Sequence, residues 1–135
     1  MAEAELAPGG LVAVLTVEPL DRLLDYRVPE AGVELGAYVL VPLGPRQVLG
    51  VVWGPGEGTF DAAKIRPIAR ALDLPPMPAA MRLFLDRAAD YTLTPRNLML
   101  RLATRAPDLG GEPPPRRVYR PGTAEPGRMT PARTR

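Results

Sequence analysis

The first half of the chain consists of short apolar runs separated by turn-forming residues. The run LVAVLTVE over residues 11–18 is β-branched and apolar, which indicates a buried strand. After the next proline, LLDYRVP predicts a second strand that alternates less cleanly. A stronger strand over residues 37–43, the turn LGPRQ and the run QVLGVVWG together predict a β-hairpin over residues 37–54.

Two further features belong to the same predicted sheet. Gly50 interrupts the second arm of the hairpin, which indicates a β-bulge or a close approach of another backbone. The run KIRPIARAL predicts a last short strand that Pro67 interrupts. Together these segments indicate a small curved β-sheet or barrel of about five to six short strands over residues 11–73.

The hydrophobic period then changes from that of strands to that of helices. From Pro78 to about Tyr91 apolar residues recur at three- and four-residue spacing, which predicts an amphipathic helix. We expect its buried face to hold Met81, Phe84, Leu85, Ala88 and Tyr91, and its solvated face Arg82, Asp86, Arg87 and Asp90.

A second helix is predicted directly after the first. Thr94 and Pro95 form a suitable N-cap and first-turn pair. The apolar residues that we expect this helix to bury are Leu98, Met99, Leu102 and Ala103. The two helices predict a helical hairpin over residues 78–105 that covers the sheet, so the fold class is β-rich α+β.

Both ends of the chain differ from this predicted body. We expect residues 1–10 to be a flexible N-terminus and residues 11–107 to form one domain. Residues 108–135 lack apolar periodicity and are rich in proline and arginine, which predicts a disordered linker. The final run MTPARTR, with Thr130 as cap, predicts the start of another helix, as expected of the front end of a longer protein.

Composition argues against most catalytic and metal chemistry. The chain has no histidine and no cysteine, which removes histidine bases, thiol nucleophiles, disulfides and the usual zinc ligands. The sequence holds no phosphate-binding motif of the form GxxxxGK[ST]. The neighbouring acids Glu18 and Asp21 flank a turn and are typical of surface residues. We therefore expect no catalytic residue, no metal site and no cofactor in these residues.

Charge is distributed unevenly along the chain. Residues 1–43 hold two arginines against seven acids, whereas residues 105–135 hold seven arginines against three acids. A basic tail is compatible with a polyanionic partner, but charge alone favours a solubilising linker. The N-terminus has no basic n-region, and no apolar run approaches the roughly 20 residues that span a bilayer. We expect a soluble, cytoplasmic protein without a membrane partner.

Five polar or flexible residues come from three separate strand ends and loops and could converge on a barrel surface: Asp25, Gly44, Arg46, Lys64 and Arg66. Small β-barrels bind single-stranded nucleic acid through such cationic surfaces. Taken singly, each of these residues is also typical of an ordinary surface strand or turn. From the residues alone, a nucleic-acid-binding module and a non-catalytic protein-interaction module both remain open.

The run LDYRVPEAGVELGAYVLVPLGPRQVLGVV over residues 24–52 resembles a known family. It is similar to the N-terminal 3′-end DNA-binding domain of the primosomal replication-restart helicase (primosomal protein N′, PriA). The shared pattern is a D-Y-x-[VL]-P strand, a glycine before a V-x-V-P-[FL]-G strand end, and a G-[IVF]-V strand. The later runs KIRPIARALD and FLDRAADYTLTPRNLMLRL also resemble that family, so the likeness spans about residues 11–107.

This resemblance implies a domain that holds the 3′-OH end of the nascent leading strand at stalled forks or D-loops. By position, Asp25 matches the acid that holds the terminal nucleotide, and Leu24 with Tyr26 belongs to the same strand motif. Gly44 matches a glycine that lets the nucleotide approach, and Arg66 matches a basic residue near the sugar-phosphate. We expect further phosphate contacts from Arg46 and Lys64.

The chain departs from the family pattern in ways that affect this prediction. Leu24 stands where phenylalanine is common, which removes a stacking surface, and Arg66 stands where lysine is usual. The resemblance implies ATP, magnesium and zinc only for a helicase portion that these 135 residues do not contain. It implies other primosome proteins and single-stranded DNA-binding protein as partners, and residues 108–135 as the linker into a winged-helix domain. We expect the domain itself to be a bacterial monomer.

Overall fold

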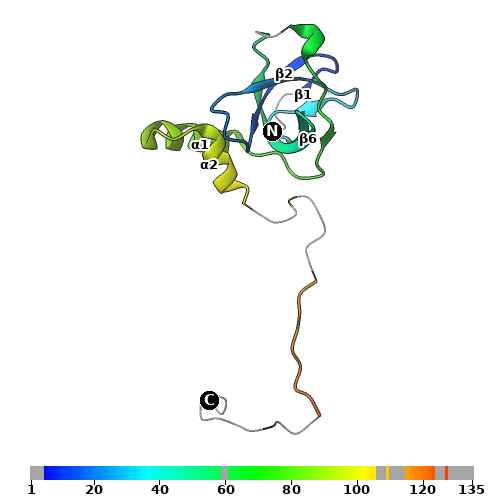
Figure 1. The fold of residues 1–135 in the computed structure, drawn as a ribbon, viewed down its shortest axis with the longest axis vertical. Helices are drawn as coiled ribbons and strands as arrows, with labels where there is room; N and C mark the ends of the chain where they lie inside the picture. Colours follow the sequence, from blue (N-terminus) through cyan, green and yellow to red (C-terminus); the bar gives the residue numbers. More distant parts are fainter. Residues whose placement is uncertain (1–4, 59–60, 106–108, 110–114, 124–126, 128–135) are drawn as a thin grey trace.

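The structure is a computed structural model that describes residues 5–58, 61–105, 109, 115–123 and 127. Strands occupy the first part of the chain and helices the second, in the order expected from the sequence (Figure 1). The elements are β1 (Glu5–Leu6), β2 (Leu11–Thr16), β3 (Leu24–Arg27), β4 (Val33–Glu34), β5 (Tyr38–Leu43), β6 (Arg46–Pro55), the 3₁₀ helix η1 (Ala62–Lys64), β7 (Arg70–Ala71), α1 (Ala79–Thr92) and α2 (Arg96–Ala103).

Five strands form one antiparallel sheet in the order β3-β2-β6-β5-β7, and β1 pairs with β4 separately. The predicted hairpin is confirmed, since Tyr38 to Leu43 pair in register with Val51 to Arg46. The pairing of β2 with β6 shifts between Ala13 and Val14, where Trp53 is the additional residue of β6. Such a bulge increases the local twist of the strand and helps the sheet to curve.

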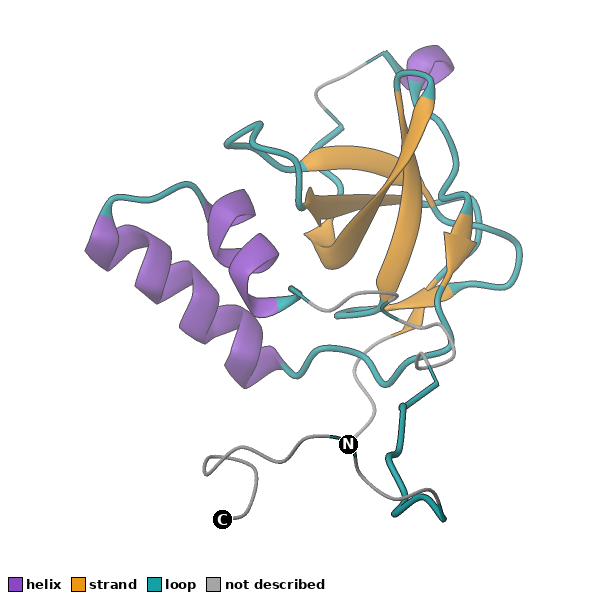
Figure 2. Cartoon of the chain, turned by 60° about the horizontal axis from the view of Figure 1, so that its bottom comes forward, coloured by secondary structure: helices purple, strands orange, loops and turns teal. Residues whose placement is uncertain are grey.

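The two edges of the sheet approach each other at one point. The Arg27 amide of edge strand β3 donates to the Arg66 carbonyl at 2.9 Å, and the Ile68 amide donates to the Arg27 carbonyl at 3.0 Å. These bonds surround a single parallel bridge between Arg27 and Pro67, in the segment that leads to β7 at the other edge. The sheet is therefore strongly curved, as Figure 2 shows, but it is not a closed barrel.

Gly50 allows two central strands to pack closely. A Cβ atom at this position would lie 2.5 Å from the Val14 Cγ1 atom and 3.2 Å from the Leu15 carbonyl oxygen. The predicted close approach is confirmed, whereas the bulge itself occurs at Trp53, on the same strand. The residue lacks a side chain because there is no space for one.

Alternating residues of the strands supply two hydrophobic cores. The inner face of the curve buries Val12, Val14, Tyr26, Val28, Val33, Val39, Val41, Val48, Val52 and Ile68. The outer face packs against the helices, where the second core consists of Leu15, Val51, Met77, Leu85 and Leu100. Figure 2 shows the two helices lying together beside the sheet, as the predicted helical hairpin requires.

The predicted buried face of α1 is wrong in part. The helix buries Arg82, Leu85 and Ala89, whereas Phe84 is 62% exposed and Tyr91 is 91% exposed. Arg82 is buried because Gly36 has no side chain: the guanidinium lies 2.4 Å from the position of a Gly36 Cβ atom. From there it donates a hydrogen bond to the Met77 carbonyl oxygen.

The predicted packing and capping of α2 also need correction. This helix buries Asn97 and Leu100, whereas Leu98 and Leu102 are exposed. Pro95 is the N-cap residue, and no side chain caps the helix. The Thr94 hydroxyl instead forms hydrogen bonds with Thr92 at the end of the preceding helix.

Beyond α2, the described residues 109, 115–123 and 127 form no helix or strand. The predicted helix start in MTPARTR and most of the predicted linker lie outside the described residues. Among the helices of the described part of the chain, none is long and apolar enough to cross a membrane.

Candidate functional site

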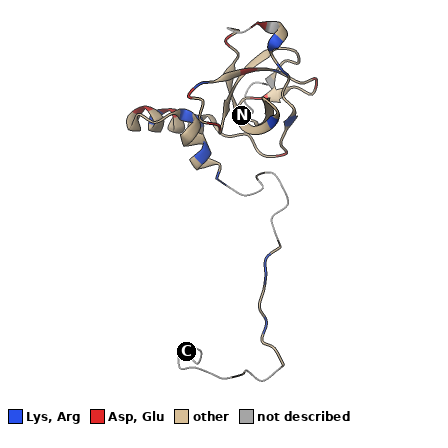
Figure 3. Cartoon of the chain, viewed as in Figure 1, with Lys and Arg blue, Asp and Glu red and all other residues tan. Residues whose placement is uncertain are grey.

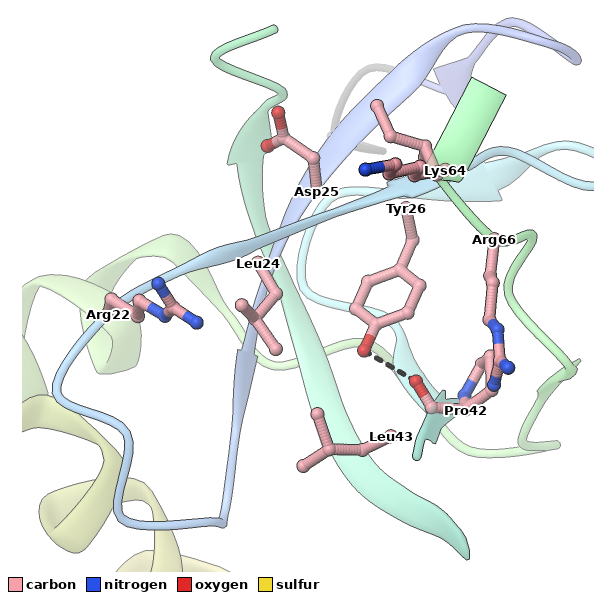
Figure 4. Close-up of a pocket in the computed structure, with 9 residues that line it drawn as sticks. Arg22, Leu24, Asp25, Tyr26, Pro42, Leu43, Lys64 and Arg66 are labelled. Carbon is pink, nitrogen blue, oxygen red and sulfur yellow. Dashed lines mark hydrogen bonds between the residues drawn. The ribbon is translucent and has the colours of Figure 1, made fainter. Parts of the chain in front are cut away.

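An open pocket lies where edge strand β3 faces the end of β5 and the segment after η1 (Figure 4). Three separate stretches of sequence build it: residues 22–26, residues 42–43 and residues 64–66. These stretches meet because the two edges of the curved sheet approach each other at Arg27 and Pro67. The lining residues are Arg22, Leu24, Asp25, Tyr26, Pro42, Leu43, Lys64, Ile65 and Arg66.

Apolar side chains form the floor of the pocket. Leu24 and Tyr26 extend from the same side of β3 toward Leu43 and Pro42 (Figure 4). The Tyr26 hydroxyl donates to the Pro42 carbonyl at 2.8 Å, and the residue is only 4% exposed within the inner core. Burial raises the pKa of Tyr26, while the nearby positive charge of Arg66 acts in the opposite direction. Tyr26 thus supports the floor, and its predicted contact with DNA stays a prediction.

Asp25 lies at the edge of the pocket, on the other side of β3 from its two neighbours. Successive strand side chains point to opposite faces, and Figure 4 shows the carboxylate directed away from Leu43. Its oxygens accept hydrogen bonds from the Glu57 amide at 3.1 Å and the Gly58 amide at 2.8 Å. The carboxylate therefore holds the loop that follows β6. An ionised carboxylate has further lone pairs, so it can still accept a bond from a ligand.

Arg66 connects the pocket to the turn of the hairpin. Its guanidinium donates to the Gly44 carbonyl oxygen at 3.1 Å, so the structure brings these two predicted residues together. Gly44 has φ of 60°, and no atom lies within 4 Å of where its Cβ would be. A glycine at the first central position suits a two-residue type II′ turn, and the space beside it is open. Its role in letting a nucleotide approach stays a prediction.

The structure separates the two predicted phosphate contacts. Lys64 lines the pocket, whereas Arg46 lies outside the lining and forms an exposed ion pair with Glu18 at 3.5 Å. Exposed ion pairs of this kind contribute little energy, so the predicted contact of Arg46 with phosphate remains open to experiment.

Arg22 was not singled out by sequence reasoning, yet it lines the pocket. It follows Asp21, whose φ of 50° turns the chain just before β3. The only sequence signal was its position directly before the LLDY run, in a loop of unknown geometry.

Charges of both signs are interspersed over the folded body, as Figure 3 shows. The pocket lining is more basic, since it holds one acid, Asp25, and three cations, Arg22, Lys64 and Arg66. Among the described residues, no group of three acids, histidines or cysteines lies close enough together to hold a metal ion.

An apolar floor with cations around it and one acceptor at its edge suits a ligand that is both apolar and anionic. The floor can cover the flat faces of a sugar or base, while guanidinium and ammonium groups attract phosphate oxygens. The lone acid, Asp25, can accept a hydrogen bond from a hydroxyl or amino group.

Comparison with known proteins gives an independent result. The family model described as the PriA 3′DNA-binding domain (3′BD) matches residues 12–105, a range that contains every residue of the pocket lining. No curated protein matches the chain.

Proposed function

Because the chain belongs to the family of PriA 3′ DNA-binding domains, we propose that it recognises the free 3′-OH end of the nascent leading strand at stalled forks and D-loops. Membership makes the chain a module that binds DNA at 3′ ends, which favours DNA binding over a protein-interaction module. Beyond membership, we propose that the bound 3′ end is a free hydroxyl and that it belongs to a stalled fork or a D-loop.

The observation that supports the proposal is the single acid in an otherwise apolar and cationic pocket. Arg22, Lys64 and Arg66 attract a DNA backbone without regard to its terminus. A site that bound only backbone phosphates would gain affinity from replacing Asp25 with a neutral or basic residue. The acid is useful where the ligand ends in a hydrogen-bond donor.

The two possible ends of a DNA strand differ in how they meet this acid. A 3′-hydroxyl can donate a hydrogen bond to the carboxylate, whereas a 3′-phosphate brings negative charge toward it and is repelled. One such contact discriminates by on the order of 1 to 3 kcal/mol. The Glu57 and Gly58 amides fix the carboxylate at the pocket edge, so it need not be reorganised when DNA binds.

We further infer that the domain serves a replication-restart DNA helicase in the bacterial cytoplasm. In that setting it would act as a monomer beside other primosome proteins and single-stranded DNA-binding protein. Support comes from the family, whose description names PriA and 3′ DNA.

The decisive experiment compares ends of one DNA strand. Fluorescence anisotropy would be used to titrate the chain with two fork oligonucleotides that are identical except for a 3′-OH or a 3′-phosphate. We expect the 3′-OH fork to bind about tenfold more tightly at moderate salt, which corresponds to the lower part of that energy range. Equal affinities would overturn the end-recognition proposal.

Asp25→Asn tests whether the acid is responsible. This variant keeps the size of the side chain and one acceptor oxygen but loses the charge, so it should bind both ends about equally. Asp73→Asn is the matched control, because Asp73 is an exposed acid outside the pocket lining. That control should retain the preference for 3′-OH. A linear strand with the same 3′-OH but no junction tests whether a fork is needed.

A further inference from the structure

The three cations of the pocket are not on one side of it. Figure 4 shows Lys64 and Arg66 beside Tyr26, whereas Arg22 lies beyond Leu24 with its guanidinium directed back toward that leucine. The apolar floor thus separates one cationic group from the other. Different elements build this arrangement, because Arg22 precedes β3, whereas Lys64 ends η1 and Arg66 follows it.

A DNA strand has one phosphate between successive nucleotides, so cations on opposite sides of the floor face different phosphates of a strand that crosses it. We propose that Arg22 binds a backbone phosphate of the DNA strand, distinct from the phosphate that faces Lys64 and Arg66. This assignment rests on the proposed function only in that the pocket receives the end of a DNA strand.

The chemistry of Arg22 suits this role. Its guanidinium is planar, always charged and able to donate two parallel hydrogen bonds to phosphate oxygens. It has enough N–H donors to contact the protein and a phosphate at the same time. The side chain is exposed, and its backbone is held between the turn at Asp21 and the start of β3.

The first measurement is the salt dependence of binding. A protein that neutralises one phosphate fewer has a slope of log affinity against log salt that is smaller by about 0.7 to 0.9. Arg22→Ala should therefore lower the slope by about that amount for a 3′-OH oligonucleotide. The ratio of wild-type to variant affinity should fall by about threefold between roughly 50 and 200 mM salt.

The second measurement identifies the phosphate. Oligonucleotides with one uncharged methylphosphonate linkage, placed first, second or third from the 3′ end, would be titrated with wild type, Arg22→Ala and Arg66→Ala. At one position, replacing the phosphate with methylphosphonate should weaken DNA binding by wild type but should not weaken DNA binding by Arg22→Ala any further. Arg66→Ala should be insensitive at a different linkage. Non-additive effects of this kind are evidence of direct contact.

Arg87→Ala is the matched control, because Arg87 is an exposed arginine of α1 outside the pocket lining. It should leave both the slope and the linkage pattern unchanged. Arg22→Lys should retain the slope, since it keeps the charge. If Arg22→Ala does not fold by circular dichroism, Arg22→Gln replaces it in both measurements.

Three results would overturn the assignment. The first is a salt slope that Arg22→Ala leaves unchanged, and the second is strict additivity of Arg22→Ala with methylphosphonate at every linkage. The third is that Arg22→Ala and Arg66→Ala become insensitive to methylphosphonate at the same linkage. Failure of the proposed function gives a different result, namely equal binding of 3′-OH and 3′-phosphate ends with the Arg22 coupling intact.

Discussion

The Gly58 amide donates a hydrogen bond of 2.8 Å to the Asp25 carboxylate, which joins the loop after β6 to edge strand β3. The Glu57 amide donates a second bond of 3.1 Å to the same carboxylate. Asp25 therefore has a structural partner as well as a proposed ligand. Altered DNA binding in an Asp25 variant therefore has two possible causes, loss of the ligand contact and release of the loop, and the next experiment measures the second.

Asp25→Ala should release this loop, because both backbone donors lose their acceptor. We expect the amide hydrogens of Glu57 and Gly58 to exchange at least about tenfold faster, as measured by NMR hydrogen exchange. Asp25→Asn retains an acceptor oxygen and should show a smaller increase. Asp73→Ala should have no effect, and unchanged exchange in Asp25→Ala would contradict the loop-anchoring role.

Gly36→Ala should destabilise the fold severely. A Cβ atom here would lie 2.2 Å from the Met77 carbonyl oxygen and 2.4 Å from Arg82, at a φ of 85°. We expect a loss of about 3 kcal/mol or more in the free energy of unfolding, measured by urea denaturation.

Gly44→Ala is the informative comparison for Gly36→Ala. Gly44 also has positive φ, but no atom lies within 4 Å of its added Cβ, so only backbone strain of about 1 to 2 kcal/mol is expected. If the open space admits a nucleotide, this folded variant should bind DNA 3′ ends more weakly than wild type. Equal destabilisation at the two glycines would be inconsistent with the packing around Gly36.

Asn97 and Thr16 form a buried polar contact, and we expect substitutions of the two residues to have opposite effects on stability. The Asn97 side-chain amide donates to the Thr16 carbonyl oxygen at 2.8 Å, so Asn97→Ala should cost about 2 kcal/mol. The Thr16 hydroxyl is buried without a hydrogen-bond partner among the described atoms. Thr16→Val should therefore leave stability unchanged or raise it by about 1 kcal/mol. A large loss in Thr16→Val would show that the hydroxyl has a partner after all.

Tyr26 should make stability depend on alkaline pH. Burial raises the pKa of its hydroxyl above the usual 10.0, so the folded state holds the proton more tightly than the unfolded state. This contribution is complete below the unfolded pKa and is lost as pH rises through the folded pKa. Thermal unfolding should thus show a fall in Tm above about pH 10 that is smaller in Tyr26→Phe. At neutral pH that variant should cost about 1 kcal/mol, because the Pro42 carbonyl loses its donor.

Sequence periodicity predicted the strands well because their apolar residues are buried on both faces of the sheet. It predicted the helix faces poorly, since α1 has a wider apolar stripe than the sheet covers, and Phe84 remains exposed. Arg82 of the same helix is buried instead. Its guanidinium donates to the Met77 carbonyl oxygen in space that is open only because Gly36, distant in sequence, has no side chain. Periodicity carries no information about such a pair.

The site was predictable to the extent that it depends on strand motifs. Leu24, Asp25, Lys64 and Arg66 do line one pocket, and Arg66 reaches Gly44. Loop geometry was not predictable, so Arg22 was overlooked and the Glu18 partner of Arg46 was not foreseen. The two amide donors of Asp25 come from a loop whose path depends on the curvature of the whole sheet.

The meeting of the sheet edges at Arg27 and Pro67 makes the pocket a product of long-range folding. One wall belongs to β3 and another to the segment before β7, so an isolated hairpin or peptide cannot reproduce it. A ligand that contacts both walls opposes separation of the two sheet edges. By thermodynamic linkage, a bound DNA end then stabilises the folded chain against unfolding.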